Sequence, residues 1–229
     1  MRKGLLPTLG LMAALASSAF SYPFKVGEVL DYDVLYLRFL QGKARLVVVE
    51  QTAYQGAKAY HMTQHVEVGS LFSNHVEITC RASDLMPLLI TTRMKRKGKE
   101  ALGRQVYVPE KRSATFSLTE GGKTKVSTFK RRHPIQDVVT VLYYLRTQNL
   151  ADGASFPVSL MEGEYTLTLA GKENLKAGIR GIPDPVECWV VKSVPSKIKV
   201  WLTPDERHLP VRVEVSGKGT PKLFLKAVQ

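Results

Sequence analysis

Apolar and polar residues alternate in short runs along most of the chain after residue 26. The alternation is clearest in Thr115–Leu118 and Val126–Phe129. A period of two residues is that of a β-strand with one buried face and one wet face. Gln41-Gly42 and Glu120-Gly121-Gly122 supply turn signals between such runs. Eight strands are expected in this half, at residues 27–39, 42–54, 58–68, 75–83, 85–97, 104–110, 112–120 and 123–131.

One stretch, RRHPIQDVVTVLYYLRTQNLADG at residues 131–153, departs from this alternation. Its apolar residues recur at positions i, i+3, i+4 and i+7, which places them on one face of an α-helix. Pro134 suits the first helical turn, and the Asp137 carboxylate would face the positive end of the helix dipole. The pattern predicts one helix of about three turns with a single buried stripe. That stripe comprises Val138, Val141, Leu142 and Leu145.

Strand-like alternation resumes after the helix, and Pro204-Asp205-Glu206-Arg207 marks a hairpin turn. Many antiparallel strands leave a concave face that side chains, a helix or a ligand must fill. The expected fold is therefore mainly β, a curved antiparallel sheet or partial barrel meander packed around one central helix. No repeat or low-complexity linker divides the chain, which predicts a single domain over residues 22–229. The six strands expected in this half lie at 154–161, 164–175, 186–194, 197–203, 209–217 and 221–228.

The N-terminus has the pattern of a secretory signal. Arg2 and Lys3 precede an apolar run, and small residues follow it up to Ser21. The apolar run is shorter than the ~20 residues that a spanning helix needs, so an N-terminal membrane anchor is the less favoured alternative. We expect residues 1–21 to be a signal peptide, cleaved near Ser21/Tyr22, and the mature protein to be exported to the periplasm.

The mature chain is expected to be strongly basic. The sequence has 33 Lys and Arg and 20 Asp and Glu, so removal of Arg2 and Lys3 leaves a net charge of +11 (33 − 2 − 20). Outside the cytoplasm, such a surface meets anionic lipid head groups before it meets nucleic acid. The expected partners are a lipid or other amphipathic envelope ligand, or an envelope protein, with peripheral membrane contact and no nucleic acid; solvated charges that protect strand edges are the alternative. The expected basic rim comprises Lys95, Arg96, Lys97, Lys130, Arg131 and Arg132.

Two cysteines, Cys80 and Cys188, each stand in a strand-like stretch. An exported chain with two cysteines can form one disulfide. Two buried free thiols that pack as small apolar side chains are the alternative. The sequence leaves both open.

The sequence lacks G-x-S-x-G, H-E-x-x-H and a glycine-rich phosphate loop. His61 and His65 would lie about 13 Å apart in a strand, too far to share one metal ion. Asp31 and Asp33 share one face of a strand, so a carboxylate pair for glycoside hydrolysis is geometrically open, but that face is expected to be wet. We expect no catalytic residue, no cofactor and no metal site.

A ligand-contacting set can be named around the helix. Asp137 stands in an element expected to be buried, where a carboxylate needs donors or a cation. It is therefore either an anchor at the helix start or an acid that contacts a ligand, and the aromatic residues nearby are either core or contact residues. The set comprises Asp137, Leu142, Tyr143, Tyr144 and Trp201.

Three stretches follow one another as motifs: FKVGEVLDYDVLYLRFLQGKARLVV, QDVVTVLYYLRTQNLADG and VWLTPDERHLPVRVEV. They resemble, in the same order, the GE-x-L-x-Y-x-V opening, the D-V-x-S-x-L-Y-Y-L-R helix and the W-L-S-x-D-x-x-R-x-P-V-R hairpin of the DUF3108 family. Thr140 stands where that family usually has Ser. The resemblance spans the mature chain and implies an exported, β-rich bacterial protein. The family's function is unknown, so the resemblance implies no chemistry.

The sequence favours a non-catalytic periplasmic or envelope protein that binds an apolar or amphipathic envelope component. A structural or assembly factor that acts by protein–protein contact is the alternative, and a hydrolase is a weaker one. A binding protein predicts a concave apolar site with a few polar groups. An assembly factor predicts a filled core with an exposed apolar patch or an open sheet edge.

Overall fold

The computed structural model describes residues 22–37, 39–217 and 221–229, and the expected signal peptide lies outside them. Within the described residues the chain forms fourteen strands, one α-helix and one 3-10 turn, Pro109–Lys111. The first strands are β1 (Val29–Tyr36), β2 (Leu40–Tyr54), β3 (Ala57–Val68), β4 (Phe72–Arg81), β5 (Pro87–Arg96), β6 (Lys99–Val108), β7 (Ser113–Glu120) and β8 (Lys123–Lys130). Helix α1 (Val138–Arg146) precedes β9 (Ser155–Leu160), β10 (Gly163–Leu175), β11 (Val186–Val194), β12 (Ile198–Leu202), β13 (Pro210–Val215) and β14 (Lys222–Val228).

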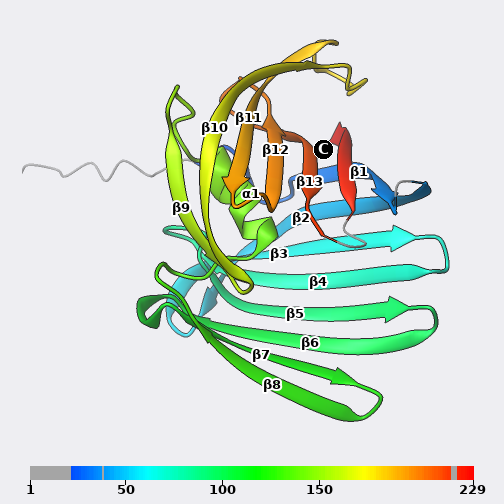
Figure 1. Ribbon diagram of the computed structural model, residues 1–229, viewed down its shortest axis with the longest axis vertical. Helices are drawn as coiled ribbons and strands as arrows, with labels where there is room; N and C mark the ends of the chain where they lie inside the picture. The colour runs from blue at the N-terminus through cyan, green and yellow to red at the C-terminus, as the bar shows by residue number, and fades with distance from the viewer. Residues whose placement is uncertain (1–21, 38, 218–220) are drawn as a thin grey trace, which may run out of the picture.

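All of these strands belong to one sheet, in the order β8-β7-β6-β5-β4-β3-β2-β1-β14-β13-β12-β11-β10-β9. The chain therefore runs as two meanders: β1 to β8 proceed from the middle of the sheet to one edge, and β9 to β14 return from the other edge. The meanders join where β1 pairs antiparallel with β14. Strands β8 and β9 are the edges, so the sheet is strongly curved but not closed (Figure 1). The expectation of a mainly β fold with one curved antiparallel sheet is confirmed.

Each expected strand is present, with ends shifted by a few residues, and the Gly121-Gly122 turn between β7 and β8 is confirmed. The predicted turn at Gln41-Gly42 is wrong, because β2 begins at Leu40 and Gly42 lies inside it. A Cβ atom on Gly42 would collide with the carbonyl oxygen of Glu67 on β3. Glycine is therefore needed there for the close approach of two strands rather than for a turn.

The two faces of the sheet differ in burial. In β1, Leu30, Tyr32, Val34 and Tyr36 are buried, whereas the residues between them are only partly buried. We call the side that carries these four residues, and the residues in register with them on the other strands, the inner face; the opposite side is the outer face. Inner-face residues of both meanders and residues of α1 form one hydrophobic cluster.

Helix α1 is buried on more sides than the sequence predicted. The single stripe is wrong, because Val139, Thr140 and Tyr143 are also buried and Val138 is only partly buried. A helix that is apolar all round is one that has packing partners on all sides. Pro134 precedes the helix instead of lying in its first turn. No helix in the described part of the chain is long and apolar enough to cross a membrane.

The helix begins with a reciprocal cap at Asp137. Its Oδ1 accepts a hydrogen bond from the backbone N–H of Val139 at 2.8 Å, and Thr140 Oγ1 accepts one from the N–H of Asp137 at 3.1 Å. These two contacts satisfy two backbone donors that the first turn leaves unpaired. The Asp137 side chain is thus the helix-start anchor, one of the two interpretations that the sequence allowed.

Arg146, the last residue of α1, forms an ion pair with Glu28 that is shielded from solvent, since the two side chains are 0% and 8% exposed. Nη1 and Nη2 donate to the two carboxylate oxygens at 2.5 and 2.8 Å. Nη2 also donates to the carbonyl oxygen of Pro23 at 2.9 Å, and Nε donates to that of Arg207 at 3.0 Å. Every guanidinium nitrogen therefore has an acceptor, as a buried cation requires.

This group, which we call the arginine junction (Arg146, Glu28 and the carbonyls of Pro23 and Arg207), joins three distant segments. Glu28 directly precedes β1, Arg146 ends α1, and Arg207 lies in the β12–β13 turn. His208 adds a contact, because its Nδ1 lies 3.0 Å from the carbonyl oxygen of Arg146. The junction therefore fixes the end of α1 to the segment before β1 and to the β12–β13 turn.

Arg146→Ala should lower the free energy of unfolding by about 3–5 kcal/mol, because it leaves the Glu28 carboxylate buried without its cation. Urea denaturation measures the change. Arg45→Ala is the matched control: it removes an arginine that pairs with Asp31 but is 58% exposed. That variant should stay close to the unchanged protein, because exposed ion pairs contribute little. Equal losses in the two variants would show that the junction does not hold the fold.

Asp137→Ala should lower the free energy of unfolding by about 1 kcal/mol, through loss of the cap. Asn is an equally good capping residue, so Asp137→Asn should retain most of the stability. Thermal melting of the two variants side by side is the measurement. If Asp137→Asn were as destabilising as Asp137→Ala, the negative charge and not the cap would be the stabilising element.

Candidate functional site

The five residues expected to contact a ligand are not gathered around a cavity. Leu142 and Tyr143 are buried in the core. Tyr144 is partly buried and packs edge-on against Phe156, with ring centroids 6.3 Å apart. The Asp137 carboxylate is taken by the helix cap, and burial raises its pKa even though backbone N–H groups donate to it. These positions therefore build the interior.

Trp201 is likewise a core residue, on β12 and away from the helix set. Its indole N–H donates to the Glu173 carboxylate at 2.6 Å. Lys199 Nζ lies 4.0 Å and the Arg212 guanidinium carbon 4.5 Å from its ring centroids. The polar and aromatic parts of the side chain are both engaged within the protein, so it offers no free contact to a ligand.

The hydroxyl of Tyr143 is buried and has no hydrogen-bond partner among the described residues. Its ring lies against the Phe24 ring, with centroids 5.0 Å apart, and 5.3 Å from the guanidinium carbon of Arg146. Burial, and then the nearby Glu28 charge, raise the pKa of Tyr143 well above its usual value. The space beside the Tyr143 ring is therefore occupied by Phe24 and Arg146.

The six residues of the expected basic rim do not form one surface. Lys95, Arg96 and Lys97 lie at the β5–β6 turn, whereas 130–132 follow the opposite end of β8. Arg131 Nε donates to the carbonyl oxygen of Leu160 at 3.2 Å, and the backbone N–H of Arg132 donates to Glu164 at 2.6 Å. The second cluster is therefore structural and ties the segment after β8 to the β9–β10 hairpin.

Cys80 and Cys188 are free, buried thiols, so the disulfide alternative is wrong for this structure. They lie on β4 and β11, strands of different meanders that are not neighbours in the sheet. Burial raises the pKa of the Cys80 thiol to about 12 and that of Cys188 to about 11. Thiolate is the nucleophilic form, so neither cysteine is suited to covalent catalysis.

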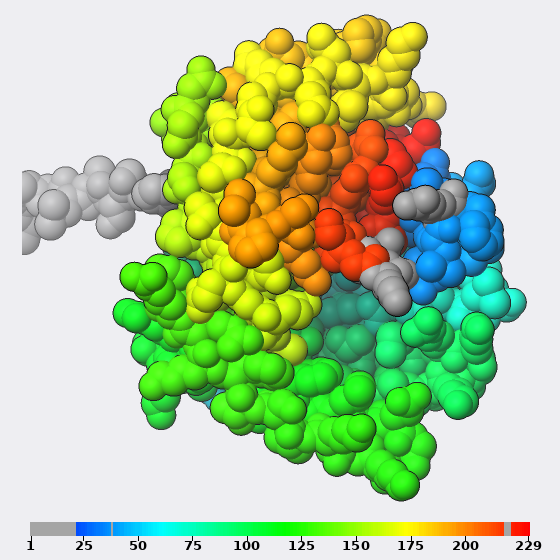
Figure 2. All heavy atoms as spheres, in the orientation of Figure 1, coloured from blue at the N-terminus to red at the C-terminus, as the bar shows by residue number. Residues whose placement is uncertain are grey.

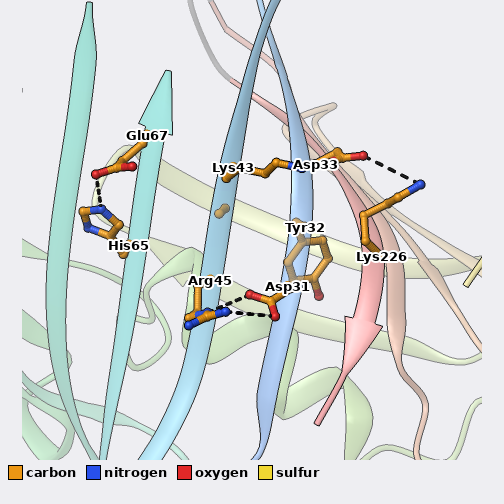
Figure 3. Close-up of a pocket in the computed structure, with 9 residues that line it drawn as sticks. Asp31, Tyr32, Asp33, Lys43, Arg45, His65, Glu67 and Lys226 are labelled. Carbon is orange, nitrogen blue, oxygen red and sulfur yellow. Dashed lines mark hydrogen bonds and ion pairs between the residues drawn. The ribbon is translucent and has the colours of Figure 1, made fainter. Parts of the chain in front are cut away.

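A depression of about 400 Å³ opens on the outer face over β1, β2, β3 and β14 (Figure 3). Its charged groups pair with one another: Asp31 with Arg45 at 2.7 Å, and Asp33 with Lys43 at 2.6 Å. His65 pairs similarly with Glu67 at 2.8 Å. The lining holds three acidic and three basic residues, so it has little net charge to offer a ligand.

The ion pairs also show where the residues considered for catalysis or metal binding lie. Asp31 and Asp33 lie on the wet outer face, as expected, and each has a cationic partner. His61 lies 3.8 Å from Glu50, apart from the His65–Glu67 pair. The described residues contain no group of three or more His, Cys, Asp or Glu placed to hold a metal ion.

The inner face is covered unevenly. At the end of β5 to β8 near α1, Ile90, Tyr107 and Ala114 are buried. Toward the turns, Met94, Phe116 and Leu118 on the same face are only partly buried, although Ala101 is buried. Ala101 and Gly103 of β6 form a low strip there, between the larger residues of β5 and β7. The side chains that border this strip are Met94, Phe116 and Leu118. We call these three residues, together with Ala101, the inner patch.

Lysines surround the inner patch on the same face. Lys99, Lys123 and Lys125 line a depression of about 710 Å³ together with Leu118, Glu100 and Glu120. Arg96 is directly opposite Lys99 in the sheet. No ion pair involves any of these four cations among the described residues, whereas the charges of the outer-face depression are paired. The inner patch therefore combines apolar surface with neighbouring cations that outnumber the carboxylates Glu100 and Glu120 and form no ion pair with them among the described residues.

Figure 2 shows the molecule hollowed beside this region. The recess lies between the C-terminal meander, in orange and red, and N-terminal strands in the colours of β4 to β6. An inner face that stays partly exposed under a covering meander is concave, and concave apolar surfaces with a few polar groups are the usual sites of small ligands. The sequence pattern identified these strands, but not which part of their inner face the second meander leaves uncovered.

Comparison with known proteins agrees with the motif resemblance. No curated protein and no solved structure matches the chain. A family model described as "Protein of unknown function (DUF3108)" matches residues 31–226, which is nearly the whole described chain. The protein therefore belongs to the DUF3108 family.

Proposed function

We propose that this protein is a non-catalytic binding protein of the cell envelope, and that its ligand is an anionic amphipathic molecule such as one with a fatty-acyl chain. The inner patch carries this proposal. Met94, Phe116 and Leu118 offer partly exposed apolar surface, and Lys99, Lys123 and Lys125 border it without carboxylate partners. An acyl chain would lie on the apolar residues while its acidic group meets the lysines.

Helix α1 fits this function as a plug that fills only part of the curved sheet. Its buried side chains share one core with both meanders. Asp137 at its start lies near enough to Tyr107 of β6 for its charge to add to the burial that raises the Tyr107 pKa. Tyr107 shares the core with residues of α1, and the inner patch lies further along β5 to β7, nearer the turns.

A binding role is also in keeping with the titratable groups. Catalytic sites bring together groups whose pKa values are perturbed toward reactivity. Here the Arg146–Glu28 pair is held by structural hydrogen bonds, and burial raises the pKa of both thiols. The net positive charge suits an exported protein that meets anionic envelope components.

Titration with cis-parinaric acid, a fluorescent fatty acid, tests the proposal. Saturable binding is expected, and Phe116→Ala and Leu118→Ala should each weaken it about tenfold, since ~1.5 kcal/mol is the lower end for one large apolar side chain. The controls are Leu102→Ala and Val126→Ala, which remove exposed apolar residues from the outer face of β6 and β8. These control variants should bind as the unchanged protein does.

A second experiment tests whether the lysines bind the acidic group of the ligand. Lys123→Gln with Lys125→Gln should weaken binding of the fatty acid and leave binding of the uncharged fatty alcohol of the same length unchanged. Absence of saturable binding, or equal effects of the inner-face and outer-face variants, would contradict the proposal. The assembly alternative would then be favoured, because edge strand β8 pairs only with β7 and is almost fully exposed.

A further inference from the structure

Three large apolar side chains are exposed at two turns of the N-terminal meander. Leu37 and Phe39, in the β1–β2 connection, are 46% and 73% exposed. Leu71, in the β3–β4 turn, is 42% exposed. None of them belongs to the inner patch. Apolar residues this exposed at consecutive turns mark a surface that meets something other than water.

Contacts hold these turns next to each other. The rings of Tyr36 and Phe72, which flank the two turns, stack with centroids 5.9 Å apart and planes 7° apart. The backbone N–H of Lys97, in the β5–β6 turn, donates to the carbonyl oxygen of Leu71 at 2.9 Å. Figure 1 shows the β1–β2, β3–β4, β5–β6 and β7–β8 turns along one side of the sheet. They form one continuous margin, fixed by side chains and backbone.

The same margin is strongly basic beside its apolar residues. The β5–β6 and β7–β8 turns, 95–100 and 120–125, contain six basic and two acidic residues, a net charge of +4 (6 − 2). The single ion pair seen there among the described residues is Lys95–Glu100, at 4.0 Å. We call Leu37, Phe39, Leu71 and these two turns the hairpin margin.

We propose that the hairpin margin docks the protein on the surface of a bilayer that contains anionic lipids. Apolar side chains beside uncompensated cations are the combination that binds such an interface, with the apolar groups at the boundary between head groups and acyl chains. Phe39, Leu37 and Leu71 enter this boundary, and the lysines of the neighbouring turns lie against the lipid phosphates.

Charge complementarity favours a bilayer over a protein partner. The cations extend over two turns without a matching row of acids, and the apolar residues stand on separate turns instead of forming a flat patch. A deformable anionic surface accommodates that arrangement, whereas a protein interface needs a close-fitting apolar centre. The docking does not depend on ligand binding at the inner patch, although it would bring the lysine-lined depression of β6–β8 close to the lipid.

Vesicle co-flotation of the expected mature chain, residues 22–229, tests the docking. Vesicles of phosphatidylcholine alone are compared with vesicles that also contain phosphatidylglycerol at about one third. Strong binding is expected only to the anionic vesicles, and it should fall as salt rises. Lys97→Gln and Lys99→Gln should each weaken it about fivefold, the equivalent of about 1 kcal/mol per cation.

The apolar contribution is tested with Phe39→Ser and Leu71→Ser, each of which should weaken vesicle binding several-fold. Val49→Ser is the matched control. Val49 is 40% exposed, but it lies on β2 next to Val48, whose backbone N–H donates to the carbonyl oxygen of Glu28, and it is therefore away from the turns. Circular dichroism checks that each variant is folded. Fatty-acid binding should be unchanged in Phe39→Ser, which separates this proposal from the function of the inner patch.

Three results would overturn the docking. The first is no preference for anionic vesicles, and the second is equal binding by Phe39→Ser, Leu71→Ser and Val49→Ser. The third is concentration-dependent self-association that Phe39→Ser abolishes, in the absence of vesicle binding, which would assign the hairpin margin to a second copy of the chain.

Discussion

The arrangement of the molecule depends on a buried guanidinium. Arg146 is fully buried, and its three nitrogens donate to one carboxylate and two backbone carbonyls. Removing a cation from water is unfavourable unless each donor finds an acceptor, so the acceptors must all come into place at once. Those acceptors belong to the segment before β1 and to the β12–β13 turn. Satisfying one side chain thus brings both meanders and the helix together.

The three motifs that resemble the DUF3108 family meet at this junction. Glu28 comes from the GE motif, Arg146 from the YYLR motif and Arg207 from the hairpin motif. Residues from all three motifs therefore contribute to one structural contact. A buried ion pair adds little net stability compared with apolar packing, but the loss of one partner is costly. Its role here is to specify one arrangement of helix and strands.

Sequence patterns predicted the local structure well. Period-two alternation identified the strands because many of them, such as β1, have one face more buried than the other. Asp137 was placed beside the helix start because carboxylates favour that position. Tertiary contacts were beyond such patterns. Gly42 is determined by the approach of β3, and the stripe on α1 failed because partners surround the helix. The burial of Arg146 could not be predicted, because arginine side chains are usually exposed and nothing in the local pattern marks this one as buried.

The candidate site was missed for the same reason. Met94, Phe116 and Leu118 alternate like core residues, and only the position of the second meander leaves them partly exposed. The sequence did indicate basic clusters, but it could not show that 95–97 and 130–132 lie at opposite ends of the strands. The molecule therefore has two regions that differ in burial: a packed centre around the arginine junction, and a partly exposed region at β5 to β8.

Native-state hydrogen exchange measures this division directly, because it reports the free energy of opening strand by strand. Amides of β1, β2, β13 and α1 are predicted to exchange only by global unfolding, and those of β7 and β8 by local opening of lower free energy. In Arg146→Ala, protection should fall in the first group and stay nearly unchanged in β7 and β8. Uniform protection across the sheet, or an equal loss in both groups, would contradict the account.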